Sequence, residues 1–60
     1  MAIVKFYVLY DNRFVVFDSR KLARAFSNKL RQNGSSVEVF KRVSYMMENV
    51  SKEVFYKIKE

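Results

Sequence analysis

Apolar residues in the middle of the chain recur at the spacing of one helix face. They lie four positions apart within residues 18–33: Leu22, Phe26 and Leu30, with Ala23 beside them. Asp18 or Ser19 provides a side-chain oxygen for the free amides at the start of such a helix. Gly34 provides the left-handed residue that often ends one. The pattern predicts an amphipathic helix over this segment, with its apolar stripe packed on the rest of the chain.

The first part of the chain has the composition of two strands around a short turn. Its apolar residues are β-branched or aromatic, which is typical of strands. Asp11 and Asn12 both tolerate a positive φ and therefore suit a two-residue turn. We predict a β-hairpin over residues 3–17 in which Tyr10 pairs with Arg13.

Both faces of this hairpin are apolar, because directly opposed residues share a face. One face carries Val4, Phe6, Val8, Tyr10, Val15 and Phe17. The other carries Ile3, Tyr7, Leu9, Phe14 and Val16, with Lys5 opposite Asp18 at its edge. An antiparallel sheet usually keeps one face for water, and a single helix covers only one face. We expect the uncovered face, the second of the two, to meet another chain, a ligand or the C-terminal segment.

Residues 36–45 are compatible with a strand and with a helix. The valines of this segment alternate with polar and aromatic residues, as in a strand. Against this, Ser35 and Glu38 have the spacing of a helix capping box. We favour a strand up to about Tyr45, since a two-stranded hairpin needs a third strand to be stable.

Residues 46–60 also leave both structures open. Val50, Val54 and Ile58 are spaced for a helix. Val54, Tyr56 and Ile58 also alternate with Phe55, Lys57 and Lys59, as in an edge strand that its lysines protect from self-pairing. The expected fold class is therefore α+β, as a single small domain over residues 1–60. It has an N-terminal β-hairpin, one amphipathic helix packed on an antiparallel sheet, and the order ββαβ followed by a C-terminal strand or helix.

The length and composition of the chain narrow the ways in which it is stabilised. A domain of 60 residues buries only about 60% of its unfolded surface, and small domains usually need disulfides, a metal or a second copy. Cysteine and histidine are absent, which excludes disulfides and a Cys/His metal site. We therefore expect a homodimer without metal or cofactor.

The charge balance favours anionic partners. Twelve Lys and Arg against six Asp and Glu give a net charge of +6. Such an excess suits nucleic acid, an anionic membrane surface or an acidic protein, and solubility alone also explains it. No apolar run approaches the ~18 residues of a membrane span. We expect a cytoplasmic protein.

Residues suited to catalysis are sparse. Without His or Cys, the commonest general base and the most reactive nucleophile are missing. The single glycine, Gly34, cannot form a glycine-rich phosphate loop. Most of the carboxylates suit a turn, a helix cap or surface ion pairs. We expect no enzymatic activity.

The sharpest candidate site is a basic surface on the predicted helix. A step of about 100° per residue places Arg20, Arg24 and Arg31 on one side, opposite the apolar stripe. Lys21 lies beside them, and Arg13 lies nearby on the hairpin. The planar fork of arginine suits phosphates and carboxylates. The alternative is an ordinary solvated helix face.

Aromatic residues on the hairpin provide a second candidate site. Tyr7 and Phe14, together with Tyr10, have the rings that stack on nucleic-acid bases in single-strand binders. The same residues also suit a dimer interface or an ordinary core, because a chain this short needs that burial to fold.

Two functions are expected from these features. The first is a small non-enzymatic binding module, homodimeric, that acts as an accessory or inhibitory protein on a macromolecular partner such as a nucleic-acid-handling protein. A very short, basic chain without cysteine is familiar from small accessory proteins of phages and other mobile elements. The alternative is direct binding of DNA or RNA by the basic helix face. A third hypothesis is a membrane-surface peptide, if residues 36–58 form one long amphipathic helix.

Overall fold

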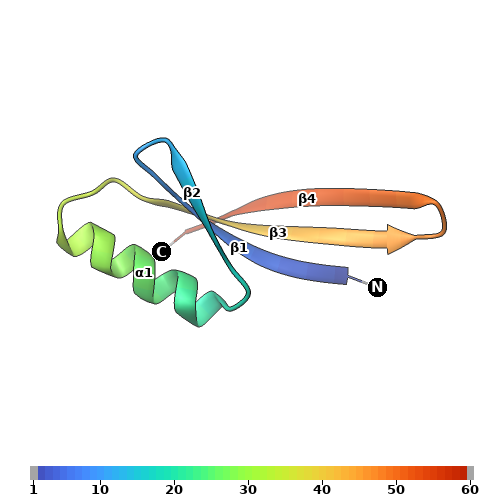
Figure 1. Ribbon diagram of the computed structural model, residues 1–60, viewed down its shortest axis with the longest axis horizontal. Coiled ribbons are helices and arrows are strands. Elements are labelled where there is room, and N and C mark those ends of the chain that lie inside the picture. The colour runs from blue at the N-terminus through green and yellow to red at the C-terminus, as the bar shows by residue number, and fades with distance from the viewer. Residues whose placement is uncertain (1, 60) are drawn as a thin grey trace.

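The computed structural model describes residues 2–59 and shows one small α+β domain. Its elements are β1 (Ala2–Tyr10), β2 (Arg13–Phe17), α1 (Arg20–Gln32), β3 (Glu38–Met47) and β4 (Val50–Ile58). The strands form one antiparallel sheet in the order β2-β1-β3-β4, with α1 on one face (Figure 1). The expected fold class is confirmed, with a strand as the fourth sheet element. A long helix over residues 36–58 is wrong.

The N-terminal hairpin has the expected turn and register. Asp11 and Asn12 both adopt positive φ, at 48° and 60°, which matches the right-handed twist of the flanking strands. Tyr10 pairs with Arg13 across this turn. The two predicted faces of the hairpin follow directly from this register.

Ser19 caps the N-terminus of α1. Its backbone is extended, and its hydroxyl accepts a hydrogen bond from the Leu22 amide at 3.5 Å, which satisfies one of the free amides of the first turn. Asp18, the other candidate cap, instead forms an ion pair with Lys5 across the hairpin. The start of the helix and the end of β2 are therefore fixed by adjacent residues.

Gly34 ends the helix in the left-handed conformation, with φ of 85°. Its amide donates to the Arg31 carbonyl at 2.9 Å, and the Ser35 amide donates to the Leu30 carbonyl at 3.0 Å. This pair of bonds is a Schellman motif, which satisfies carbonyls that the last turn leaves free. The chain then turns back into β3.

The helix meets the sheet through small side chains. Ala23 and Ser27 are fully buried, and Ala23 packs with the buried strand residues Phe6, Val8 and Val39. Partly buried side chains surround this core: Tyr10, Phe17, Phe26, Leu30, Val37 and Ile58. The hydroxyl of Ser27 donates to the Arg24 carbonyl at 2.9 Å, so its burial leaves no polar group unsatisfied.

The expected packing of Leu22 on the sheet is wrong, because its side chain is 58% exposed. The buried stripe is shifted by one residue toward Ala23. Small residues at the contact let the helix backbone lie close to the sheet, and the Phe26 ring then fills the flank beside Tyr10 and Phe17. The ring centroids lie 5.6 and 5.4 Å away, respectively.

The sheet extends well beyond the helix. α1 lies over β1, β2 and β3, while β3 and β4 continue as a long hairpin past its N-terminal end (Figure 1). The molecule measures 44 × 21 × 17 Å. Its radius of gyration is 12.9 Å, against about 10 Å for a compact chain of this length. Apolar side chains at the hairpin tip, such as Met46, Met47 and Val50, are exposed.

Replacing Ala23 with leucine tests the close approach of α1 to the sheet. Ala23→Leu adds volume where no space exists, so the free energy of unfolding falls by about 1–3 kcal/mol. Denaturant unfolding followed by circular dichroism measures this. Ala25→Leu is the matched control, because Ala25 lies exposed on the same helix and its replacement leaves stability nearly unchanged. Equal effects of the two substitutions would contradict the described packing.

Candidate functional site

The strand register sorts the charged residues between the two faces of the sheet. Since opposed residues share a face, the face that α1 covers, here called the helix side, includes Lys41, Tyr45, Lys52 and Tyr56. The opposite face is here called the open face. Its exposed or half-buried side chains include Ile3, Lys5, Tyr7, Leu9, Phe14, Val16, Arg42, Glu53, Phe55 and Lys57.

Cations on the open face are paired with carboxylates. The three ion pairs are Lys5 with Asp18, Arg42 with Glu53 (Nη2 to Oε1, 3.4 Å) and Lys57 with Glu38 (Nζ to Oε1, 3.6 Å). The register places Glu38 and Glu53 on this face, and Asp18 follows β2 directly. The strand part of the open face is therefore close to electrically neutral.

Among the described residues, the helix side carries more cations than carboxylates. α1 contains no acidic residue, and the helix-side positions of the described strands contain none either. Asp11 and Glu48 lie in the two hairpin turns. The net charge of +6 is consequently concentrated on one side of the molecule, which favours the approach of an anion from that side.

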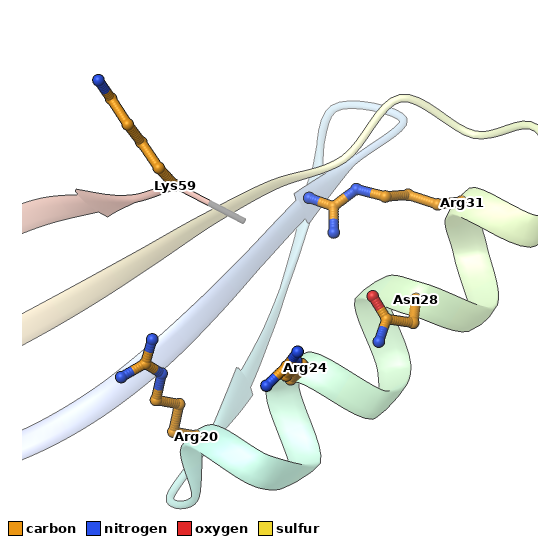
Figure 2. A pocket seen from close by; sticks show the side chains of 5 residues that line it. All are labelled: Arg20, Arg24, Asn28, Arg31 and Lys59. Carbon is orange, nitrogen blue, oxygen red and sulfur yellow. The ribbon is translucent and has the colours of Figure 1, made fainter.

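A groove beside α1 is lined by three of these cations and by Lys59, whose side chain points away from the helix (Figure 2). It encloses about 480 Å³ and is lined by Arg20, Arg24, Asn28, Arg31 and Lys59. The four helix residues form a row along one flank of α1, and Lys59 stands at the end of β4 (Figure 2). Arg31 is also held by a hydrogen bond from Nη2 to the Val37 carbonyl, at 3.3 Å. We call this set of five residues the basic groove.

The structure brings together most of the predicted basic residues. Arg20, Arg24 and Arg31 share the basic groove, and Lys21 joins Arg20 and Arg24 around a smaller neighbouring hollow. Arg13 begins β2 beside the hairpin turn and lines neither hollow.

Sequence reasoning missed Asn28 and Lys59 as members of the basic groove. Asn28 follows Arg24 by one helical turn, so the spacing alone identifies it. The position of Lys59 depends on the pairing of β4 with β3, for which the residue pattern gives no unique solution.

The open face contains an aromatic cluster centred on Tyr7. Its ring makes edge-to-face contacts with Phe14 and Phe55, with centroids 5.9 and 6.0 Å apart. The Arg42 guanidinium lies 5.7 Å from the centre of the Tyr7 ring and donates hydrogen bonds to the Tyr7 and Ser44 hydroxyls. Together with the Glu53 ion pair, these bonds engage all three nitrogens of the guanidinium.

The residues predicted for a partner surface fall on this one face. Ile3, Phe14 and Val16 are exposed, whereas Tyr7 and Leu9 are half-buried. β3 and β4 widen the sheet without covering either face, so the C-terminal segment is not the cover of the open face. Sequence reasoning missed Phe55 and Arg42, because their place beside Tyr7 also depends on the register of β3 and β4.

Two further observations concern the described residues 2–59. No three Asp, Glu, His or Cys side chains among them come close enough to hold a metal ion, and none of their helices has the length and apolar character to cross a membrane. Comparisons of the chain with models of protein families, with curated proteins and with solved structures find no match.

Replacing Arg24 tests the repulsion within the row of arginines. Arg24 lies four residues after Arg20 and three residues after Lys21, and each such pair of like charges destabilises a helix by about 0.2–0.5 kcal/mol. Arg24→Gln removes both pairs and should therefore raise the free energy of unfolding by about 0.4–1 kcal/mol at low ionic strength, and the gain should vanish in high salt. Lys29→Gln is the control, since no cation lies three or four residues from Lys29. A loss of stability in Arg24→Gln at low salt would exclude mutual repulsion.

Proposed function

We propose that the protein is a non-enzymatic module that binds nucleic acid by holding the phosphate backbone in the basic groove. The observation that carries this proposal is the row of Arg20, Arg24 and Arg31 along one flank of α1, which lines a groove together with Asn28 and Lys59. Helix-side cations that repel one another cost stability, and a bound polyanion relieves that cost.

The dimensions of the groove suit several phosphates. Arg20 and Arg31 are eleven residues apart, which corresponds to about 16 Å along the helix axis. One strand of B-form DNA carries about five phosphates over that length, at ~3.4 Å each. Arginine supports such contacts through its planar fork of donors, and the Asn28 amide adds a neutral donor to the row.

The helix side also offers aromatic rings next to cations. Tyr45 and Tyr56 are exposed on the part of the sheet that α1 leaves uncovered. Tyr45 is opposite Lys52, and Tyr56 is opposite Lys41. Proteins that bind single strands commonly combine cationic side chains with aromatic rings on which the bases stack. This surface supports a preference for single-stranded over double-stranded nucleic acid.

The open face supports base stacking less well. Its cluster of Tyr7, Phe14 and Phe55 is aromatic, but the nearby Arg42 is already bound to Glu53. A neutral face with fixed carboxylates does not attract phosphates.

An accessory or inhibitory role toward a nucleic-acid-handling protein receives weaker support than direct binding. The nucleic-acid site of such a partner is itself electropositive, so it repels the helix side.

Salt dependence of binding tests the groove. In a titration of labelled single-stranded oligonucleotide, the double variant Arg20→Gln, Arg24→Gln should reduce the slope of log K against log salt by about 1.4, because each lost phosphate contact removes about 0.7. The control Lys5→Gln, Lys57→Gln removes the same charge from the open face and should leave the slope nearly unchanged. If the two variants have equal slopes, net charge alone explains the salt dependence, and the basic groove is excluded as the binding site.

A tyrosine substitution tests the preference for single strands. Tyr56→Ser removes one stacking ring, worth about 1–3 kcal/mol per base, and should weaken binding to a single strand at least several-fold while binding to duplex changes little. The control Tyr10→Phe changes a ring that packs on Phe26 and should affect neither. If Tyr56→Ser weakens binding to the single strand and to the duplex equally, base stacking on Tyr56 is excluded.

A further inference from the structure

We propose that a second copy of this chain covers the open face, in a back-to-back dimer that carries its two basic grooves on opposite outer surfaces. The dimer itself is argued from the area, charge and chemistry of the open face. Only its consequence, the bridging of two nucleic-acid segments, rests on the proposed function.

The chain exposes more surface than a compact protein of its mass. A compact protein of 7.2 kDa is expected to expose about 4,100 Å², whereas this chain exposes 4919 Å². The excess is about 800 Å², the area that each partner contributes to a standard protein interface. The chain therefore has a spare surface large enough for one stable contact.

Charge decides which face a second copy covers. In a two-fold dimer the same patch meets itself, so a patch of one sign repels its copy. The helix side opposes its own arginines in such a dimer, whereas the open face carries balanced pairs such as Arg42 with Glu53. The neutral face is the self-complementary one.

The side chains of the open face have the composition of an interface core. Phe14, Phe55 and Val16 are 61%, 56% and 50% exposed, and aromatic residues are enriched at the centres of interfaces. Arg42, the cation among them, is prepared for burial. Its guanidinium is already bonded to Tyr7, Ser44 and Glu53, so covering it leaves no charge unpaired.

A dimer joined through the open face turns both helices outward. Each basic groove lies on the helix side, which is the face away from the interface (Figures 1 and 2). Two grooves that point in opposite directions cannot follow one short strand. The two copies therefore supply two sites, which can bind two nucleic-acid segments at once.

Sedimentation equilibrium tests the dimer without any nucleic acid. The wild-type chain should have twice the monomer mass at micromolar concentration, and Phe14→Ser should raise the dimer dissociation constant at least tenfold. Leu22→Ser is the matched control, because Leu22 has nearly the same exposure (58%) on the helix side and should leave the dimer intact. A monomeric wild type, or equal dissociation constants for the two variants, would overturn the proposal.

Thiol labelling provides a second readout that does not depend on a weakened core. Because the chain contains no cysteine, Val16→Cys and Ala25→Cys each introduce one thiol, on the open face and on the exposed side of α1. The Val16→Cys thiol should react with maleimide more slowly as protein concentration rises, while the Ala25→Cys rate stays constant. A constant rate for Val16→Cys would count against a covered open face.

An assay for the bridging of two oligonucleotides tests the dimer and the proposed function separately. Wild-type protein bound to an immobilised oligonucleotide should capture a second, labelled one, and Phe14→Ser should bind the first but not capture the second. A dimer that binds no oligonucleotide supports the interface and refutes the proposed function. A monomer that binds one oligonucleotide supports the proposed function and refutes the dimer.

Discussion

The limited reach of one helix on a four-stranded sheet is the constraint on which the rest of this structure depends. α1 has thirteen residues and covers the sheet over β1, β2 and β3 only. The contact is narrow because it is made through Ala23 and Ser27, whose small side chains let the helix backbone lie close to the sheet. Three features follow from it: a small core, a groove along the flank of the helix, and an entire sheet face without cover.

The sequence predicted those parts of the fold whose signals are local. The turn at Asp11 and Asn12 defines the register of the hairpin, because each residue adopts the positive φ that a two-residue turn requires. The two ends of the helix were also predictable, from Ser19 and Gly34.

The packing of Leu22 was predicted wrongly, because periodicity identifies an apolar arc of a helix but not the rotation of the helix against the sheet. The rotation is decided by which residue permits the closest approach, and Ala23 does so better than its larger neighbour.

Non-local pairing explains why only part of the candidate site was predictable from the sequence. The arginines of α1 lie on one helix, so their spacing alone places them together. The strand residues Lys41 and Tyr56 join the same side only because β3 pairs with β1 and β4 pairs with β3. A shift of one residue in the register of β3 with β1 would move both side chains to the opposite face, and a shift in the register of β4 with β3 would move Tyr56 alone. The pattern of residues 36–60 was also compatible with a helix, and it therefore did not determine the strand register.

The ion pairs change the charge of each face more than they change the stability of the fold. Exposed ion pairs add little to folding, about 0–1 kcal/mol each, and the pairs of Lys5 with Asp18 and Lys57 with Glu38 are of this kind. Their larger effect is electrostatic, because they neutralise the open face and leave the excess charge on the helix side. A protein with one neutral apolar face and one cationic face presents different surfaces to a protein and to a polyanion. Both proposals depend on this separation, which only the strand register reveals.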